Sequence, residues 1–445
     1  MGQYIENLAA FTATARWDDV PPPVQAHAKL VLLDIIGVIL AGSLRPEVSE
    51  LRQRLIGGTG ATLLAPGLPA ADPRTAALLN AIAGRSIELC DGLRGVQPSV
   101  QIFPGLLAAG EQRRSSAQDI LMALIMGYEV AGRLALGFTP RRLAHGNGQV
   151  ALLAAVAAAA RLRGFDALGI SLAMRIATTM LLTPSYTSTA AGATTLNVAG
   201  GMSGFAAVLA PDLALAGYTA RDDAIEEALG EMVGAGFDPA RTTGDGSWQI
   251  AENYFRFYAC CNPIHPALDC LKDVLGLLPA EPGAIDRIDA STHAFASVMR
   301  NQNPPNYFAS KYSFPHAASV LAVRGGLGYA DLDDTALTDP AIAALRARVF
   351  LTEDPAMSAL APGLRQARVT VTLKDGRQAT AARDMSRRDQ EHPDPAPDVH
   401  AKFRELAGTV LTEAGVAAVE ALVGQADGSH FTLTETLRRH LRSYT

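Results

Sequence analysis

A series of alanine- and leucine-rich segments constrains the fold more than any other feature of this 445-residue chain. The clearest segment runs from Val150 to Arg163 and carries six alanines between positions 154 and 160. Small side chains give a helix a nearly bare surface that neighbouring helices can approach closely, and Gly164 is suited to end it. Similar helical patterns cover residues 25–42, 73–83, 102–109, 117–136, 166–180, 200–210 and 225–232. We therefore expect the first part of the chain to form an all-helical domain.

Two of these helices have recognisable start signals. The Asp72 side chain can cap the helix that begins near Pro73. Pro73 is a second signal, because proline suits the first helical turn. Ser115 or Ser116 can cap the expected helix over 117–136. By contrast, segment 183–197 is rich in Ser, Thr, Gly and Ala and is expected to be a loop.

The character of the sequence changes after about residue 270. Residues 286–296 alternate as a strand does, and segments 369–374 and 377–382 flank Asp375 and Gly376, which is a strong hairpin signal. A polar, proline-rich linker is expected at 389–398, and segments 400–406, 415–422 and 432–442 return to the helical composition of the first part. The expected fold class is mainly α: a large, discontinuous all-helical domain over 1–268 and 399–445, and a smaller α/β (α+β) domain over 269–398.

Composition limits the classes of partner. Hydrophobic residues make up 49% of the chain and charged residues only 18%, so we expect extra surface to be buried between subunits. A net charge of −6 gives no indication of nucleic acid or of an anionic membrane as a partner. A small anionic substrate would need a local cationic pocket.

The sequence also indicates a compartment. The most apolar run, residues 30–41, is interrupted by Asp34 and is interpreted as too short to span a bilayer. No basic-then-apolar signal precedes it. Only four cysteines occur, which is typical of a reducing, cytoplasmic setting. Three of them, Cys260, Cys261 and Cys270, lie near His265 in the sequence. Their spacing does not match a zinc site, so no metal is expected.

Four short segments combine ionisable groups with Gly, Pro or Ser in this mostly apolar chain. These segments are 88–97, 145–149, 256–265 and 311–316. Histidine, lysine and tyrosine side chains suit proton transfer, and arginine suits the bidentate binding of a carboxylate. The alternative for each segment is a local cap or surface turn, and Glu88 in particular can pair with Arg85 on one helix face.

The residues resemble those of the MmgE/PrpD family over nearly the whole chain. The resemblance rests on 32–37 (LLDIIG), 87–91 (IELCD) with Pro98-Ser99, 127–130 (GYEV), His145 before an alanine-rich helix, Cys261 with His265 and Asp269, and 313–316 (SFPH). It implies a helical domain and a smaller α/β domain, a homodimer with a cleft between domains, and no cofactor. The family includes dehydratases, decarboxylases and an iminodisuccinate epimerase, and their reactions share the loss of a proton beside a carboxylate.

The resemblance also implies which residues form the site. The acidic residue of family dehydratases and decarboxylases falls at Glu88 or Asp91, and one of their histidines matches His145. At Gln97 the family has another histidine, and at Arg256 it has a lysine. A lysine of the family's Gly-rich loop falls near Thr194. Loss of hydroxide needs an acid near the leaving oxygen, and two usual candidates are replaced by Gln97 and Thr194, which argues against dehydration and decarboxylation.

The leading hypothesis is therefore an epimerase, an isomerase that inverts a Cα centre of an iminodisuccinate-like amino-polycarboxylate by two-base proton transfer. The expected acids and bases are His145, His316, Lys311 and Tyr312. The expected substrate-binding residues are Arg256, Arg94, Asp91, Glu88, Gln97 and His265. One alternative is a dehydratase or decarboxylase of a citrate-like tricarboxylate, and a second is a helical protein that binds a polycarboxylate without converting it.

Overall fold

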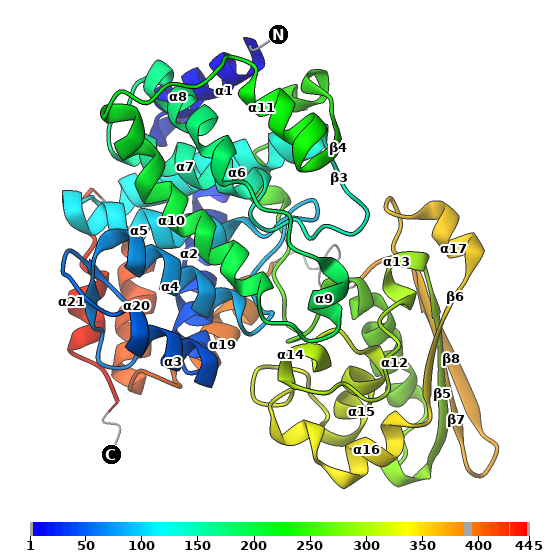
Figure 1. Cartoon of the computed structure of the whole chain (residues 1–445). Coiled ribbons are helices and arrows are strands. Elements are labelled where there is room, and N and C mark those ends of the chain that lie inside the picture. Colours follow the sequence, from blue (N-terminus) through cyan, green and yellow to red (C-terminus); the bar gives the residue numbers. More distant parts are fainter. Residues whose placement is uncertain (1–2, 245, 387–393, 427, 443–445) are drawn as a thin grey trace. The chain divides into compact units, whose positions relative to one another are not determined.

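The computed structural model describes residues 3–244, 246–386, 394–426 and 428–442. The chain divides into two compact units, each with its own core (Figure 1). Unit 1 comprises Met1–Tyr186, Thr195–Asn253 and Ala396–Thr445, and unit 2 comprises Thr187–Thr194 and Tyr254–Pro395. The fold class is mainly α with a smaller sheet-containing part, as the sequence predicted. Residues 389–393 of the expected linker lie outside the described residues.

Unit 1 is built mostly from helices. They are α1 (Gln3–Thr14), α2 (Pro22–Gly42), α3 (Pro46–Leu55), α4 (Pro73–Arg85), α5 (Pro98–Arg113), α6 (Ala117–Gly137), α7 (Val150–Leu162), α8 (Ala167–Ala177), α10 (Leu196–Leu215), α11 (Ala224–Glu227), α19 (Ala396–Ala407), α20 (Glu413–Gln425) and α21 (Leu433–Arg438). Two short antiparallel pairs join them, so the unit is not purely helical. They are β1 (Ala61–Thr62) with β2 (Ala70–Ala71), and β3 (Phe138–Pro140) with β4 (Gly234–Phe237).

The alanine-rich helix α7 is the centre of unit 1. Every residue from Val150 to Ala160 is fully buried, and α5, α6, α8 and α10 pack around it (Figure 1). Glycines on the neighbouring helices allow the close approach. A Cβ at Gly127 of α6 would lie 3.2 Å from the Ala158 Cβ, and one at Gly105 of α5 would lie 2.5 Å from the Ala207 Cβ. The run of alanines in the sequence predicted this tight packing of the helices.

The predicted helix starts are confirmed. The Asp72 side chain accepts hydrogen bonds from the backbone N–H groups of Arg74 and Thr75 at the start of α4. Ser116, one of the two candidates, caps α6 and forms a capping box with Asp119. The expectation of a loop throughout 183–197 is wrong, because α9 (Tyr186–Ala190) forms within it and α10 already begins at Leu196.

The C-terminal helices join the N-terminal ones through a buried ion pair. Lys402 of α19 lies 2.7 Å from the Asp34 carboxylate of α2, and its ammonium also donates to the Leu89 carbonyl at 2.6 Å. Burial raises the pKa of Asp34 to about 6, although the positive charge of Lys402 opposes that shift. This pair connects the C-terminal segment to the N-terminal one, and unit 1 is therefore discontinuous in sequence, as predicted.

Unit 2 contains a four-stranded mixed sheet in the order β6-β5-β7-β8. Strand β5 (Ile285–Thr292) pairs in parallel with β6 (Val349–Glu353) and antiparallel with β7 (Ala367–Leu373), which pairs antiparallel with β8 (Gln378–Arg383). The hairpin around Asp375 and Gly376 is confirmed, with Gly376 at a φ of 87°.

Short helices accompany this sheet. They are α12 (His265–Leu277), α13 (Ala294–Ser297), α14 (Tyr307–Ser310), α15 (Phe314–Arg324), α16 (Pro340–Arg346) and α17 (Pro355–Leu360). Helix α12 packs on β7 and β8. Unit 2 therefore begins at Tyr254, earlier than the predicted boundary at 268, which lies inside α12.

Three helices of unit 1 are long and apolar enough to cross a membrane by length and composition alone. The interpretation that segment 30–41 is too short is wrong, because α2 continues from Pro22 to Gly42 and has 21 residues. In the structure, 72% of the most apolar window of α2 is buried, and the values for α6 and α10 are 83% and 56%. The expectation that a membrane is not a partner stays a prediction.

Candidate active site

A buried carboxylate organises the loop between α4 and α5 in unit 1. Asp91 is fully buried, and its Oδ1 accepts a hydrogen bond from Ser99 Oγ at 2.5 Å. Its Oδ2 accepts one from the Tyr128 hydroxyl and another from Asn253 Nδ2 at 2.8 Å. Burial and the charge of Asp91 raise the pKa of Tyr128 well above its usual value, so this tyrosine stays protonated. The three donors hold Asp91 as an anchor of the loop that carries Gln97.

Two other charged residues of this loop have partners inside unit 1. Glu88 forms an ion pair with Arg85, and both side chains are fully buried, which confirms the pairing considered from the sequence. Arg94 is exposed, and its Nε donates to Gln249 Oε1 at 3.2 Å. Both Glu88 and Arg94 have positive φ values, 55° and 46°, so the loop is sharply turned at these residues.

His145 is held in one orientation on the neighbouring loop. The Asn147 backbone N–H donates to the ring Nδ1 of His145 at 3.3 Å, and the His145 backbone N–H donates to the Pro184 carbonyl at 2.9 Å. The ring stacks on Tyr186 with centroids 5.7 Å apart and planes 13° apart. Because Nδ1 accepts a hydrogen bond, a neutral His145 ring carries its proton on Nε2. The side chain is 8% exposed.

Gln101 of α5 brings the two loops together. Its Nε2 donates to the Gln97 carbonyl at 2.9 Å and to Asn147 Oδ1 at 3.5 Å, and its Oε1 accepts from the Gly148 N–H at 2.9 Å. A Cβ at Gly146 would lie 3.0 Å from the Gly95 carbonyl oxygen, so the loops are in direct contact. Unit 1 thus brings Gln97 and the His145 loop together.

Unit 2 holds the other five predicted residues. They are Arg256, His265, Lys311, Tyr312 and His316. All five are at most 2% exposed. The Cys261 N–H donates to the Lys311 carbonyl at 2.8 Å, which brings the 256–265 and 311–316 segments together. Unit 2 therefore contains two buried cationic side chains, Arg256 and Lys311.

Lys311 is surrounded by polar and aromatic groups of unit 2. Its ammonium donates to the Leu332 carbonyl at 2.6 Å and lies 4.0 Å from the centroid of the Tyr307 ring. Tyr312 packs its ring against Phe308, with centroids 5.6 Å apart. The roles predicted for Lys311 and Tyr312 as acid or base stay predictions.

The two predicted histidines of unit 2 are held neutral. Burial, then the charges of Arg346 and Lys311, lower the pKa of His316 to about 3. Its Nδ1 accepts a hydrogen bond from Arg346 at 3.0 Å. Burial and Arg256 also lower the pKa of His265, whose Nε2 donates to the Cys260 carbonyl at 3.1 Å. Both rings suit hydrogen-bond donation better than taking up a proton.

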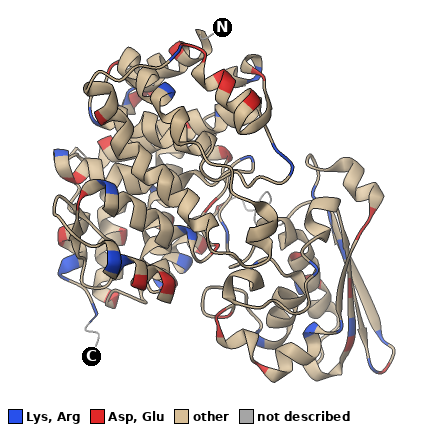
Figure 2. Cartoon of the chain, in the orientation of Figure 1, with Lys and Arg blue, Asp and Glu red and all other residues tan. Residues whose placement is uncertain are grey.

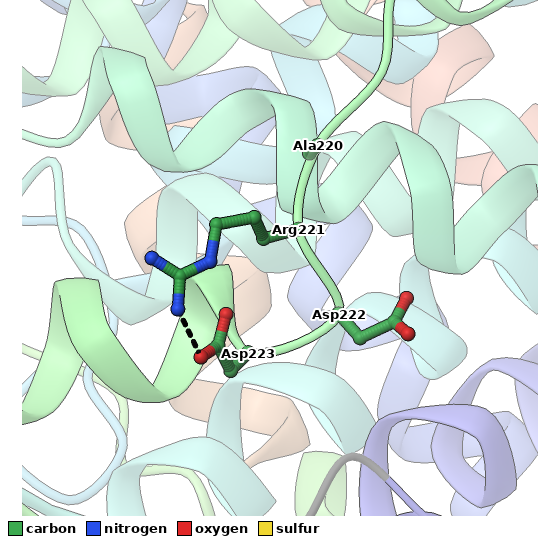
Figure 3. Close-up of a pocket in the computed structure, with 4 residues that line it drawn as sticks. All are labelled: Ala220, Arg221, Asp222 and Asp223. Carbon is green, nitrogen blue, oxygen red and sulfur yellow. Dashed lines mark hydrogen bonds and ion pairs between the residues drawn. The ribbon is translucent and has the colours of Figure 1, made fainter.

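Two surface hollows of unit 1 do not fit an anionic substrate. One, of about 520 Å³, is lined by Ala220, Arg221, Asp222 and Asp223 (Figure 3). Its arginine is already paired with Asp223 at 2.5 Å, and Asp222 adds a second negative charge. The other, of about 430 Å³, includes Arg163, which is paired with Asp212 at 2.6 Å. Within the described ranges, no cluster of three or more His, Cys, Asp or Glu could hold a metal ion.

Charged side chains of both signs are interspersed along the ribbons of each unit (Figure 2). The polar residues that distinguish unit 1 are instead uncharged and buried. They include Gln97, Gln101, Asn147, Gln149 and Asn197, each at most 5% exposed. The sequence analysis singled out segment 145–149, which contains Asn147 and Gln149, without naming either as a site residue, and it missed Gln101 and Asn197. The available signal was their position at the starts of otherwise apolar helices.

Comparison with known proteins gives the family. The MmgE/PrpD N-terminal domain matches residues 6–239, and the MmgE/PrpD C-terminal domain matches residues 258–426. The chain belongs to the MmgE/PrpD family. The resemblance seen in the short motifs is therefore confirmed, and the two matched regions meet between residues 239 and 258, close to the start of unit 2.

One relative of this MmgE/PrpD protein corrects the expected enzyme class. The chain is 22% identical to cis-aconitate decarboxylase from Aspergillus terreus, over 91% of this chain and 89% of the relative. A decarboxylase is a lyase, so this similarity overturns the expectation of an isomerase. The inference from Gln97 and Thr194 gave too much weight to two positions, because an acid for the leaving group can come from another residue.

Proposed function

We propose that this MmgE/PrpD protein is a lyase that acts on a citrate-like tricarboxylate, by decarboxylation or by dehydration. The observation that carries the proposal is the similarity to a tricarboxylate decarboxylase over 91% of the chain. The loops of unit 1 support it, because they hold a buried histidine beside a group of buried hydrogen-bonding side chains.

Both reactions pass through a carbanion that a neighbouring carboxylate stabilises. In decarboxylation the bond between carbon and a carboxylate breaks, CO₂ leaves, and an acid delivers a proton to the conjugated carbanion. In dehydration a base removes a proton next to a carboxylate, and an acid protonates the departing hydroxide. Each therefore needs a proton carrier and groups that stabilise negative charge in the transition state.

His145 is the proton carrier in this proposal. The Asn147 N–H fixes Nδ1 as an acceptor, so Nε2 is the atom that gives or takes the proton. Stacking on Tyr186 fixes the plane of the ring, which keeps Nε2 in one direction. Asp91 acts as a positioning residue, because its hydrogen bonds to Ser99 and Asn253 hold the loop next to His145.

The test is a product assay with three substrates: cis-aconitate, citrate and 2-methylcitrate. Release of CO₂ from cis-aconitate indicates decarboxylation, and a rise in ultraviolet absorbance from either saturated acid without CO₂ indicates dehydration. We expect one of these two outcomes. Binding of the acids without any conversion would contradict the proposal and favour a binding protein.

A further inference from the structure

Three helices of unit 1 that pack against one another, α5, α7 and α10, begin without a side-chain cap, as α2 and α3 also do. Helices α5, α7 and α10 have 16, 13 and 20 residues, and their N-cap residues are Gln97, Gln149 and Thr195. No side chain in the described part of the chain caps any of them. In the same unit, Asp72, Ser116, Asp166 and Thr412 cap α4, α6, α8 and α20. The first N–H groups of an uncapped helix, together with its dipole, favour a negative charge.

The three uncapped helix starts lie together. Gln101, in the first turn of α5, accepts a hydrogen bond from the Gly148 N–H just before α7 and another from Ser203 of α10, both at 2.9 Å. A Cβ at Gly148 would lie 3.5 Å from the Ala199 Cβ of α10. The helices also pack against one another along their lengths (Figure 1). Their partial positive charges therefore act on one small region of unit 1.

Buried amides with unused hydrogen-bonding atoms occupy this region. Among the described residues, no partner is found for Gln97 Oε1, Asn147 Nδ2, Asn197 Oδ1 or either polar atom of Gln149. These side chains are 5%, 0%, 2% and 0% exposed, respectively. Buried polar groups are nearly always hydrogen-bonded, so four such amides at one place indicate a polar ligand. Rotation of an amide by 180° exchanges its donor and acceptor, so each side chain can present an NH₂ group to an anion.

The chemistry of the region selects the ligand. Three helix starts and four amides supply many N–H donors and no negative charge of their own. Two buried acids lie near the region, and both have partners. Asp91 accepts hydrogen bonds from Ser99 in the first turn of α5, from Tyr128 and from Asn253, and Glu88 is paired with Arg85, which packs beside Gly200 of α10. A carboxylate fits this arrangement because its oxygens accept several N–H donors at once.

We propose that the starts of α5, α7 and α10, with Asn147 and Gln149 as the principal side-chain donors, form the subsite that binds one carboxylate of the substrate. This inference rests on the proposed function, because it assigns a part of the same polycarboxylate substrate. The subsite uses neutral donors, so it binds the anion without depending on the titration of an arginine or lysine.

The test measures binding of tricarballylate, a saturated tricarboxylate that cannot be dehydrated. Wild type should bind it by calorimetry and show a melting temperature that rises with its concentration. Gln149→Glu places a carboxylate at the start of α7, and Asn147→Asp places one beside it. We expect each change to weaken tricarballylate binding at least tenfold. We also expect Gln149→Glu to raise the melting temperature of the ligand-free protein, because its own carboxylate takes the place of the ligand.

Three controls keep the test decisive. Asn7→Asp makes the same charge change at an exposed position of α1 and should leave binding unchanged. Gln149→Met removes both polar atoms without adding charge and should weaken binding several-fold, which decides the matter if Asn147→Asp does not fold. Inorganic phosphate should bind more weakly than tricarballylate.

Several results would overturn the subsite. They are no binding of tricarballylate to wild type, equal binding to wild type and to a folded Gln149→Glu protein, and equal binding of phosphate and tricarballylate. Failure of the proposed function has a different signature. In that case the amide variants lose tricarballylate binding as expected, but wild type converts none of the three assay acids.

Discussion

Individual buried polar residues of unit 1 fall into two groups with different consequences. Asp91 accepts hydrogen bonds from Ser99 and Asn253, and Asp34 forms an ion pair with Lys402, so these two carboxyl groups stabilise the position of a loop and of a helix. Gln149 and Asn147 are neutral, and in the described part of the chain their unused atoms lack partners. His145 lies next to Asn147, so we assign the proton transfer of the proposed reaction to this part of unit 1.

His145 gives the first prediction. Replacing it with glutamine removes the proton carrier but keeps a polar side chain of similar reach, so kcat should fall by about 10²–10⁴ with little change in KM. Steady-state kinetics with the tricarboxylate that wild type converts would measure both constants. His400→Gln, on α19 of the same unit, is the matched control and should keep wild-type kcat. A His145→Gln enzyme with wild-type kcat would remove this residue from the mechanism.

His316 gives a prediction about pH and stability. Its pKa is about 3 in the folded protein and about 6.5 when unfolded, so between these values the unfolded state binds one more proton. The free energy of unfolding therefore rises with pH up to about 6.5 and is lost as the pH falls below it. His316→Gln should remove this contribution, which amounts to about 1.4 kcal/mol between pH 7.5 and 5.5.

Urea denaturation of both proteins at pH 7.5 and 5.5 would measure the effect. Wild type should lose more stability than His316→Gln on acidification. An identical loss in the two proteins would mean that the ring of His316 is protonated in the folded state as readily as in the unfolded one.

Helices and strands were predictable where one local signal dominated. Asp72 and Ser116 specified helix starts, and Asp375-Gly376 specified a hairpin, because capping and turn chemistry act over only a few residues. Strand β6 (Val349–Glu353) was missed because its pairing partner, β5, is about 60 residues earlier in the chain. Segment 183–197 was misjudged because its Ser, Thr and Gly residues favour a loop locally, whereas the structure forms the short helix α9 within it.

The ion pair between α2 and α19 gives a prediction about the stability of the protein. Lys402→Met leaves the buried Asp34 carboxylate without its cation, and Asp34→Asn leaves the ammonium without its anion. Each change should destabilise the protein by about 3–5 kcal/mol, and the double variant should cost clearly less than the sum. Chemical denaturation of the four proteins gives the coupling free energy. Additive costs would show that the two charges do not stabilise each other.

For the whole molecule, the sequence predicted the fold class and the family, and it did not predict the enzyme class. The discontinuous helical unit followed from the shared composition of the first and last segments, which the Asp34–Lys402 pair joins. Only part of the candidate site could be predicted from the sequence. His145 and Gln97 stand out in the sequence, whereas Asn147, Gln149 and Asn197 matter through their burial at the starts of α7 and α10. A cytoplasmic homodimer remains a prediction, and light scattering in solution would test the dimer.

The most direct test of the proposed lyase is NMR spectroscopy of cis-aconitate incubated with the protein in heavy water. If a carbanion forms and is protonated by a side chain that exchanges with solvent, each product molecule should carry one deuterium on carbon. One CO₂ should be released per product if the enzyme is a decarboxylase, and none if it is a dehydratase that hydrates cis-aconitate in the reverse direction. Unchanged cis-aconitate, together with unchanged citrate and 2-methylcitrate under the same conditions, would contradict the proposed lyase. A product without deuterium would contradict the carbanion and the proton transfer assigned to His145.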